Sequence, residues 1–313
     1  MGFAGAMAVA IAIDAVLGWP ERLFLLIGHP VTWLGRVIDR VDDACNRNSD
    51  SSAFRRVAGI VATLFLIALP TALAWIVEMQ LTTGWSRIVI AGILAWPFVA
   101  LRSLHDHVAA VAQPLQAGNI DAARSAIAHI VGRDPAGLDD TGIARASIES
   151  LAENTSDGVI APVFWGVIFG LPGLVGYKAI NTLDSMIGHR TPRHEDFGWA
   201  AARIDDVANF IPARLTGFVF AVLAPRPASA ISCMVEDAHR HRSVNAGWPE
   251  AAVAGALGVR LSGPRIYDGS LADEPWLNGG ARDPLAADVT QALKLYRRAM
   301  WLTAAVLVIL AVV

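Results

Sequence analysis

The sequence predicts an all-α, polytopic integral membrane protein, and three observations lead to that class. First, 54% of the 313 residues are hydrophobic and 17% are charged, against roughly 45–50% and about 25% in ordinary soluble domains. Second, residues 57–77 carry no charge over a length that can cross the roughly 30 Å hydrocarbon core of a bilayer. Third, no strand-like alternation of useful length appears. We therefore expect one membrane-embedded helical domain over residues 1–313, with cytoplasmic segments near 102–157 and 225–297.

The apolar runs define the expected membrane helices in chain order. Residues 1–18 are apolar, but they lack the basic start of a signal peptide, so we expect an uncleaved inserted helix. Residues 57–77 and 88–101, separated by a short polar turn, predict a helical hairpin. Residues 299–313 predict a last spanning or deeply inserted helix. Tryptophans at positions 75, 85 and 301 mark the ends of these runs, where indole rings favour the headgroup zone.

Arginine placement predicts the orientation of the hairpin. Arginines cluster before the hairpin, at 36, 40, 47, 55 and 56, and again after it, at 102, 124, 133 and 145. We therefore expect both flanks on the cytoplasmic side. The membrane is expected to be the inner membrane of the cell. Residues 158–175 contain Pro162 and Pro172, and residues 207–224 contain Arg214. We interpret both as partly inserted or re-entrant helices. If both spanned, residues 176–206 would lie outside; if neither did, they would stay cytoplasmic.

The remaining segments predict cytoplasmic structure. Between 102 and 157 we expect helices, with a turn and an N-cap at 118–121 before a helix over 122–130. Residues 225–284 are rich in Gly and Pro and predict surface loops around one helix starting at Pro249. Cys45 and Cys233 are too few for a disulfide framework. The net charge of −3 gives no indication of nucleic-acid binding.

Asparagine and aspartate recur three residues apart, and this spacing predicts a magnesium site. The pairs are Asn154 with Asp157, Asn181 with Asp184, and Asp206 with Asn209. A spacing of three places both side chains on one helix face, and hard oxygen ligands suit Mg²⁺ and the phosphates it carries. The candidate metal ligands are Asn154, Asp157, Asp184, Asp205 and Asp206.

A helix over 141–157, capped by Asp140 or Thr141, would carry a carboxylate stripe. Its apolar face would hold positions 148, 151, 152 and 155, and the opposite face Glu149, Glu153 and Asp157. The stripe is either a solvated acidic face or, because it leads into an apolar run, part of a site. Glu149 and Glu153 are the candidate catalytic residues, with Glu149 as a possible base.

Basic and amide side chains nearby predict binding of an anionic group. A second helix, over 178–187, would be either an amphipathic interfacial helix or part of the same site. Arg203 with Asp206 is otherwise explained as a surface ion pair, and His29 either binds substrate or closes the turn before Pro30. The candidate substrate- and phosphate-binding residues are His29, Lys178, Asn181, Arg190, Arg203, Asn209 and Arg214. Neither a P-loop nor a G-x-G-x-x-G turn is present in the sequence.

Seven motifs in one order resemble the CobD/CbiB family, the adenosylcobinamide-phosphate synthases of cobalamin biosynthesis. They are Gly28-His-Pro-Val-Thr-Trp, Val131-Gly-Arg-Asp, Glu149-Ser-Leu-Ala-Glu-Asn-Thr-Ser-Asp-Gly-Val, Asn181-Thr-Leu-Asp-Ser-Met-Ile-Gly-His-Arg, Phe197-Gly-Trp-Ala-Ala-Ala-Arg-Ile-Asp-Asp, Ile211-Pro-Ala-Arg and Asn245-Ala-Gly-Trp-Pro-Glu-Ala. The resemblance covers nearly the whole chain. It identifies no role for individual residues, and residues 268–284 match no motif.

The resemblance implies a ligase that forms a carbon–nitrogen bond. The corrinoid adenosylcobyric acid would be joined through a carboxylate to (R)-1-amino-2-propanol or its O-phosphate, with ATP as co-substrate and Mg²⁺ as cofactor. The lipid bilayer and other enzymes of the pathway are the remaining expected partners. Two alternatives stay open from the residues: a Mg²⁺-dependent membrane prenyl or phospho-alcohol transferase, and a non-catalytic membrane sensor or scaffold.

Overall fold

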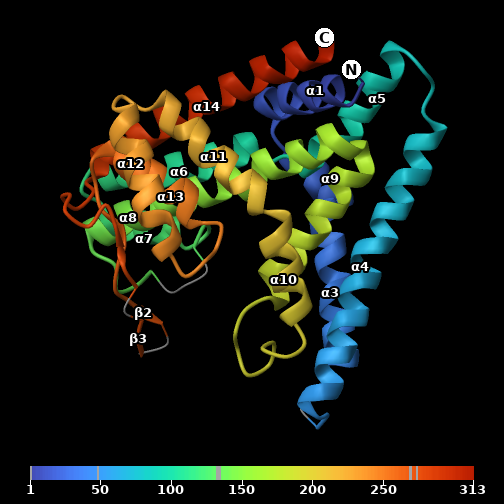
Figure 1. The fold of residues 1–313 in the computed structure, drawn as a ribbon, viewed down its shortest axis with the longest axis horizontal. Helices are drawn as coiled ribbons and strands as arrows, with labels where there is room; N and C mark the ends of the chain where they lie inside the picture. The colour runs from blue at the N-terminus through green and yellow to red at the C-terminus, as the bar shows by residue number, and fades with distance from the viewer. Residues whose placement is uncertain (1, 48, 132–134, 268–269, 273) are drawn as a thin grey trace. The chain divides into compact units, whose positions relative to one another are not determined.

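The computed structural model describes residues 2–47, 49–131, 135–267, 270–272 and 274–313, and helices make up most of this chain (Figure 1). The described chain divides into two compact units. The first contains residues 1–100, 161–209 and 304–313, and the second contains residues 101–160 and 210–303. The predicted all-α class is confirmed; the single-domain organisation stays a prediction.

Several of the described helices are long and apolar enough to cross a bilayer, which agrees with the predicted membrane class. Judged by length and composition, these are Ser52–Gln80, Trp85–Gln116, Asp140–Ile187 and Ala286–Val312. Two pairs of helices, each bent at a short break, raise the number of candidate spans from 4 to 6 if each pair forms one span. These pairs are Gly2–Leu17 with Glu21–Cys45, and Trp199–Ala208 with Phe210–Leu223.

In the first unit, the long helix α9 (Ala161–Ile187) packs against α1, α3, α4 and α10 (Figure 1). Capping residues explain where two of these helices begin: the Ser51 side chain caps α4, and Pro30 occupies the first turn of α3, where its missing N–H costs nothing. The bounds in this unit are α1 Gly2–Leu17, α2 Glu21–Ile27, α3 Pro30–Cys45, α4 Ser52–Gln80, α5 Trp85–Ala95, the 3₁₀ turn η1 Trp96–Phe98 and α10 Trp199–Ala208.

A carboxylate from α4 closes a break in α9. Gly170 has φ 68°, a left-handed conformation that interrupts the helical backbone. The freed N–H of Leu171 donates to Glu78 Oε2 at 2.8 Å, and Arg87 donates to Glu78 Oε1 at 3.0 Å. A Cβ at position 170 would lie 2.4 Å from Glu78 Oε2. The prolines at 162 and 172 had suggested an interrupted helix over residues 158–175. The interruption is at Gly170 instead, and Pro172 lies in the first turn after it.

The loop of residues 188–198 packs closely on α4. Phe197 is buried with Leu66 and Leu183 in the apolar cluster between α3, α4 and α9. Gly59 on α4 permits this approach, because a Cβ there would lie 1.9 Å from the Phe197 carbonyl oxygen. This small residue thus lets the loop lie directly on the helix backbone.

In the second unit, α13 (Gly247–Leu257) lies at the centre and packs against α8, α11 and α12. The other elements are α6 Leu101–Gln116, α7 Ile120–Ile127, α8 Asp140–Thr155, the π-helical turn η2 Ser156–Ile160, α11 Phe210–Leu223, α12 Pro227–Asp237, the 3₁₀ turn η3 Ala238–Arg240 and the start of α14 Ala286–Val312. Two short antiparallel pairs complete it: β1 Leu261–Ser262 with β4 Trp276–Leu277, and β2 Arg265–Tyr267 with β3 Ser270–Ala272.

Three local predictions for this unit need correction. Residues 225–284 are not surface loops around one helix, since they include α12 and the buried α13, which starts at Gly247 and not at Pro249. The small residues of α13 are buried almost all round, so they produce no helical periodicity. The N-cap of α8 is Asp139, which accepts from the Gly142 N–H at 2.7 Å, and not Asp140 or Thr141. The predicted cap at Asn119 is confirmed.

We expect Glu78→Ala to destabilise the first unit. The substitution leaves the Leu171 N–H without its carboxylate acceptor and the Arg87 charge without its partner. The free energy of unfolding should fall by about 1–3 kcal/mol, measured as a lower Tm of the purified protein in mild detergent. Glu78→Gln, which keeps an acceptor, should lose less, and the exposed Glu21→Ala serves as control. Equal Tm values for Glu78→Ala and Glu21→Ala would contradict the assignment.

The two cysteines should differ sharply in reactivity. Cys45 is exposed at the end of α3, whereas Cys233 is buried on α12. Burial, together with nearby Asp237, raises the pKa of the Cys233 thiol to about 12, and the thiolate is the reactive form. A water-soluble maleimide should label native wild type once in detergent, Cys233→Ser equally, and Cys45→Ser not at all. Mass spectrometry would count the labels, and labelling of native Cys45→Ser would refute the placement of Cys233.

Candidate functional site

A polar face on the C-terminal half of α9 is the centre of the candidate site. Lys178, Asn181 and Asp184 follow one another at one-turn intervals, and all three are half-buried. The Lys178 ammonium donates to Asn181 Oδ1 at 3.1 Å. On the other side of the helix Leu183 and Ile187 are buried in the core, so packing fixes the direction in which the polar face points. The predicted helix over 178–187 is confirmed.

Helix α10 adds a second carboxylate and an arginine to this face. α10 packs against α9, and on α10 Arg203 forms an ion pair with Asp206, with 2.9 Å between Nη1 and Oδ2. Asp184 lies within electrostatic range of Asp206, Arg203 and His189. The polar face of α9 and the Arg203–Asp206 pair of α10 therefore lie on helices that pack against each other. Of the remaining predicted basic residues, Arg190 is exposed in the following loop.

The donor set fits a magnesium ion that is carried by a phosphorylated ligand. Mg²⁺ is usually held by one or two carboxylates together with waters and substrate phosphates, and seldom by a cage made of protein alone. Asp184 and Asp206 meet that description. Within the described part of the chain, no group of three or more His, Cys, Asp or Glu residues is placed to hold a metal. Magnesium binding at this site stays a prediction.

Asp205 and Asn209 form a buried hydrogen-bonded chain with Tyr177. The Tyr177 hydroxyl donates to Asn209 Oδ1 at 2.8 Å, and the Asn209 amide donates to Asp205 Oδ2 at 3.0 Å. Asp205 is 9% and Asn209 1% exposed. The Asn209 amide thus bonds the carboxylate four residues back and not Asp206, with which its spacing had grouped it. This chain holds the end of α10 against α9.

His29 caps the start of α3. Its Nδ1 accepts from the Val31 N–H at 3.2 Å, while its own backbone N–H donates to Thr32 Oγ1 at 3.2 Å. The Trp19 ring packs edge-on against the imidazole at 4.9 Å between centroids, and the charge of Lys178 acts on it. Of the two interpretations of His29, the structure shows the turn-closing one. Substrate binding by His29 stays a prediction, with Lys178 as the neighbouring cation.

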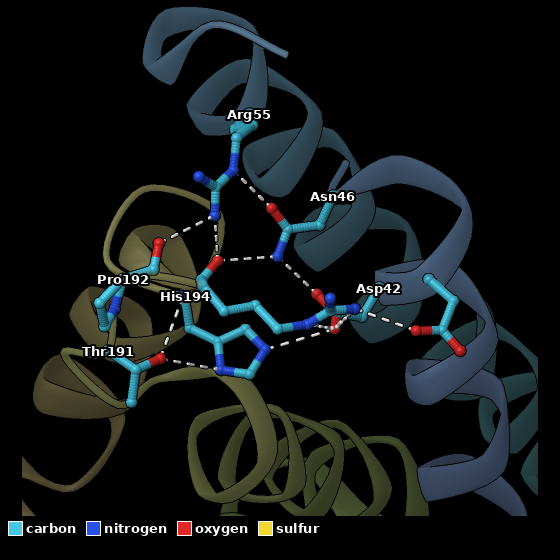
Figure 2. A network of polar contacts seen from close by, with 8 residues as sticks. Asp42, Asn46, Arg55, Thr191, Pro192 and His194 are labelled. Atoms are coloured by element: carbon cyan, nitrogen blue, oxygen red, sulfur yellow. Dashed lines mark hydrogen bonds and ion pairs between the residues drawn. The ribbon is translucent and has the colours of Figure 1, made fainter. Parts of the chain in front are cut away.

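A polar network, shown in Figure 2, ties the loop of residues 188–198 to α3 and α4. Buried Asp42 accepts from Arg193 Nε at 2.8 Å and from the Asn46 amide at 2.7 Å, and it lies 3.3 Å from His194 Nε2. The Asn46 amide also donates to the Arg193 carbonyl, and Arg55 donates to that carbonyl and to Asn46 Oδ1. The hydrogen bond to Asp42 raises the pKa of the Arg193 guanidinium.

Sequence reasoning missed this network. Its members lie about 150 positions apart in the chain, at Asp42 on α3 and at Arg193 and His194 in the loop. The only local feature that could have indicated the network is the pair of aspartates at 42 and 43 on an amphipathic helix. That pair does not show which of the two carboxylates is buried. The network matters for the site because the same loop begins about one helical turn after Asp184, at residue 188, and carries Arg190.

The candidate residues on α8 belong to the second unit and do not behave as one stripe. Glu149 is buried and accepts from the Ser262 N–H of β1 at 2.6 Å, whereas Glu153 is exposed. Asn154 donates to the Ser150 carbonyl at 2.9 Å, and Asp157 is half-buried in the π-helical turn. Glu149 and Glu153 lie one turn apart on α8, but they do not form a common solvated acidic face, because β1 covers Glu149. Convergence of Asn154 and Asp157 with Asp184 and Asp206 stays a prediction.

Arg214 lies in an aromatic cradle of the second unit. Its guanidinium is 3.5 Å from the ring centroid of Phe210 and 4.5 Å from that of Trp248. It donates to Asn245 Oδ1 at 3.3 Å and to the Phe210 carbonyl at 2.7 Å. Two of the recognised motifs, at 211–214 and 245–251, thus meet through this side chain. Of the motif at 131–134, residues 132–134 lie outside the described residues.

Comparison with known proteins assigns the chain to a family. The model of the CobD/Cbib protein family matches residues 7–296. The chain belongs to the CobD/CbiB family. A protein of Rhodobacter capsulatus named cobalamin biosynthesis protein CobD is 60% identical over 300 residues, which cover 96% of this chain and 95% of the relative. The proteins of that name in Rhizobium meliloti and Brucella suis biovar 1 are each 44% identical, over 91% and 93% of this chain and 90% and 91% of the relatives. No solved structure matches.

We expect Asp42→Asn to loosen the loop of residues 188–198 in this CobD/CbiB family member. It removes the charge that holds Arg193 and His194. Hydrogen exchange of the loop amides should accelerate on the order of tenfold, because a hydrogen bond to a charged group contributes about 1.5–3 kcal/mol. Asp43→Asn is the matched control, since Asp43 also contacts Arg193 but its side chain is 80% exposed. Equal exchange in the two variants would show that Asp42 does not anchor the loop.

Proposed function

We propose that this chain forms an amide bond in cobalamin biosynthesis. It would join (R)-1-amino-2-propanol, or its O-phosphate, to a carboxylate of adenosylcobyric acid, giving adenosylcobinamide or its phosphate. Family membership, with 60% identity to a cobalamin biosynthesis protein over 96% of the chain, supports a role in this pathway. The observation that supports the reaction type is that Asp206 and Arg203 lie within electrostatic range of Asp184, on the helix that also carries Lys178, because these groups suit a phosphorylated ligand.

The chemistry requires an activated acyl donor. A carboxylate is a poor electrophile, so its oxygen would attack the γ-phosphorus of ATP, releasing ADP and giving an acyl phosphate. The amine nitrogen then attacks the acyl carbon, inorganic phosphate leaves, and the nitrogen gives up one proton. The overall balance is one ATP for one amide bond. This order of steps needs a site that holds transferring phosphate and one base near the amine.

The residues of the first unit suit the phosphate side of this reaction. Asp184 and Asp206 would hold Mg²⁺, which when bound neutralises charge on the transferring phosphoryl group. Arg203, through its remaining N–H groups, and Lys178 would bind phosphate oxygens. Asn181 keeps Lys178 in place by its hydrogen bond. The loop anchored by Asp42 would bring Arg190 to the same end of α9.

Two of the predicted roles fall on residues of the second unit, taken by itself. Glu149 is engaged with the Ser262 N–H, so of the two predicted catalytic carboxylates the exposed Glu153 is the better candidate for taking the proton from the amine. Arg214, oriented by Phe210 and Trp248, would bind an anionic group of the corrinoid or of aminopropanol phosphate. We place the reaction at the cytoplasmic side of the inner membrane, on the arginine-rich flanks of the hairpin.

Asp184→Asn and Asp206→Asn should each lower amide formation on the order of 100-fold. The assay uses the purified full chain in detergent with adenosylcobyric acid, MgATP and either aminopropanol or its phosphate, with product measured by mass spectrometry. Each variant should also need more Mg²⁺ for half-maximal rate. Asp39→Asn, an exposed carboxylate on α3, is the control. Wild-type rates in both site variants would exclude these residues, and no ATP-dependent product with either amine would refute the proposed function.

A further inference from the structure

An apolar groove runs along the first unit, outside the polar face of α9. It lies between α4, α9 and α10, which pack on one another (Figure 1), and has a volume of about 840 Å³. Of the described residues that line it, only Arg203 is charged. The apolar walls include Ile60, Leu64, Ile67, Phe169, Ile180 and Val207. None of these apolar residues takes part in the proposed reaction.

An arginine lies beside one end of the groove. Trp199 and Arg203, one turn apart on α10, line the groove, and Arg203 is paired with Asp206. The guanidinium of Arg56 lies 4.3 Å from the ring centroid of Trp199, and Ile60, one turn after Arg56 on α4, also lines the groove. Arg56 is exposed, and none of the described carboxylates pairs with it. Its charge is therefore open to a ligand that enters the groove from this end.

The length of the groove matches one leaflet of a bilayer. From Ile60 to Thr71 it follows α4 over three helical turns, which is about 16 Å at 1.5 Å per residue. That is about half of the roughly 30 Å hydrocarbon core. An acyl chain whose headgroup lies at Arg56 would thus reach the groove's far end at about the middle of the bilayer.

The groove also opens on a surface that suits lipid. α4 is one of the candidate spans, and the lining side chains of Leu64, Phe169 and Val207 are 54%, 56% and 77% exposed. Helix–helix contacts in bilayers favour small residues that let two backbones approach. Bulky side chains, including Trp199, line this groove instead, and they leave room for a flexible acyl chain.

We propose that this groove is a binding site for an anionic phospholipid, with one acyl chain between α4, α9 and α10 and the headgroup phosphate at Arg56. The guanidinium of Arg56 is held by Trp199, so it binds a phosphate with little loss of side-chain freedom. A net negative headgroup is preferred to a zwitterionic one, because the zwitterion brings its own cation towards Arg56.

The test is lipid retention by the full-length chain. The protein is reconstituted in phosphatidylcholine nanodiscs that contain a minor fraction of phosphatidylglycerol, released, and examined by native mass spectrometry. Wild type should retain one phosphatidylglycerol in preference to phosphatidylcholine. Arg56→Gln should reduce this preference about fivefold, from the roughly 1 kcal/mol that one basic residue contributes at an anionic surface. Val207→Trp, which fills the groove from an exposed position, should abolish retention of either lipid.

Matched controls separate the site from general membrane effects. Arg40→Gln removes an exposed arginine of α3 elsewhere on the unit, and Val61→Trp enlarges an exposed side chain of α4 that does not line the groove. Both should retain phosphatidylglycerol like wild type. A photoreactive phosphatidylglycerol should crosslink to groove residues. Equal retention of the two lipids by wild type would overturn the proposal, and so would crosslinks spread over the whole unit. The proposal would also fail if Val207→Trp caused the loss of a dimer and not the loss of a bound lipid.

Discussion

The first unit depends on one carboxylate that completes an interrupted helix. In hydrocarbon, each backbone N–H without an acceptor costs several kcal/mol, so a break in a membrane helix persists only where another group replaces the lost hydrogen bond. Glu78 supplies that replacement to Leu171, and Arg87 balances its charge. The contact joins α4, α5 and α9, and it sets the direction of the second half of α9. That half carries Lys178, Asn181 and Asp184, so the geometry of the candidate site begins with a bond about two helical turns before it.

The site is then held from its other end by long-range polar contacts. Asp42 on α3 fixes the loop that follows α9, while Asp205, Asn209 and Tyr177 fix the end of α10. These buried groups are all engaged in hydrogen bonds with protein, as rigid support for a binding site requires. The exposed or half-buried groups between them, Asp184, Asp206 and Arg203, are the ones left to meet a ligand.

The composition of the site was predictable, but its pairing was not. The Asn–Asp spacing led to α9 and α10, where Asp184 and Asp206 lie within electrostatic range of each other. Spacing along one helix does not, however, decide which neighbour an amide bonds: Asn181 bonds Lys178, Asn154 bonds Ser150, and Asn209 bonds Asp205. Each choice depends on which side chain the surrounding helices bury. Glu149 shows the same limit, because β1 arrives from 113 residues away and covers it.

The sequence alone determined that the chain is helical and suited to a bilayer, and that residues 57–77 and the run from 88 form helices. It also determined the family. Composition, hydrophobic runs and local motifs are properties of neighbouring residues, so they can be recognised without the fold. The tertiary structure decided the break at Gly170, the loop clamp at Asp42, the buried small-residue helix α13 and the apolar groove beside α10. Each of these arises where segments distant in sequence pack together, and packing between distant segments leaves no periodic signal in either one alone.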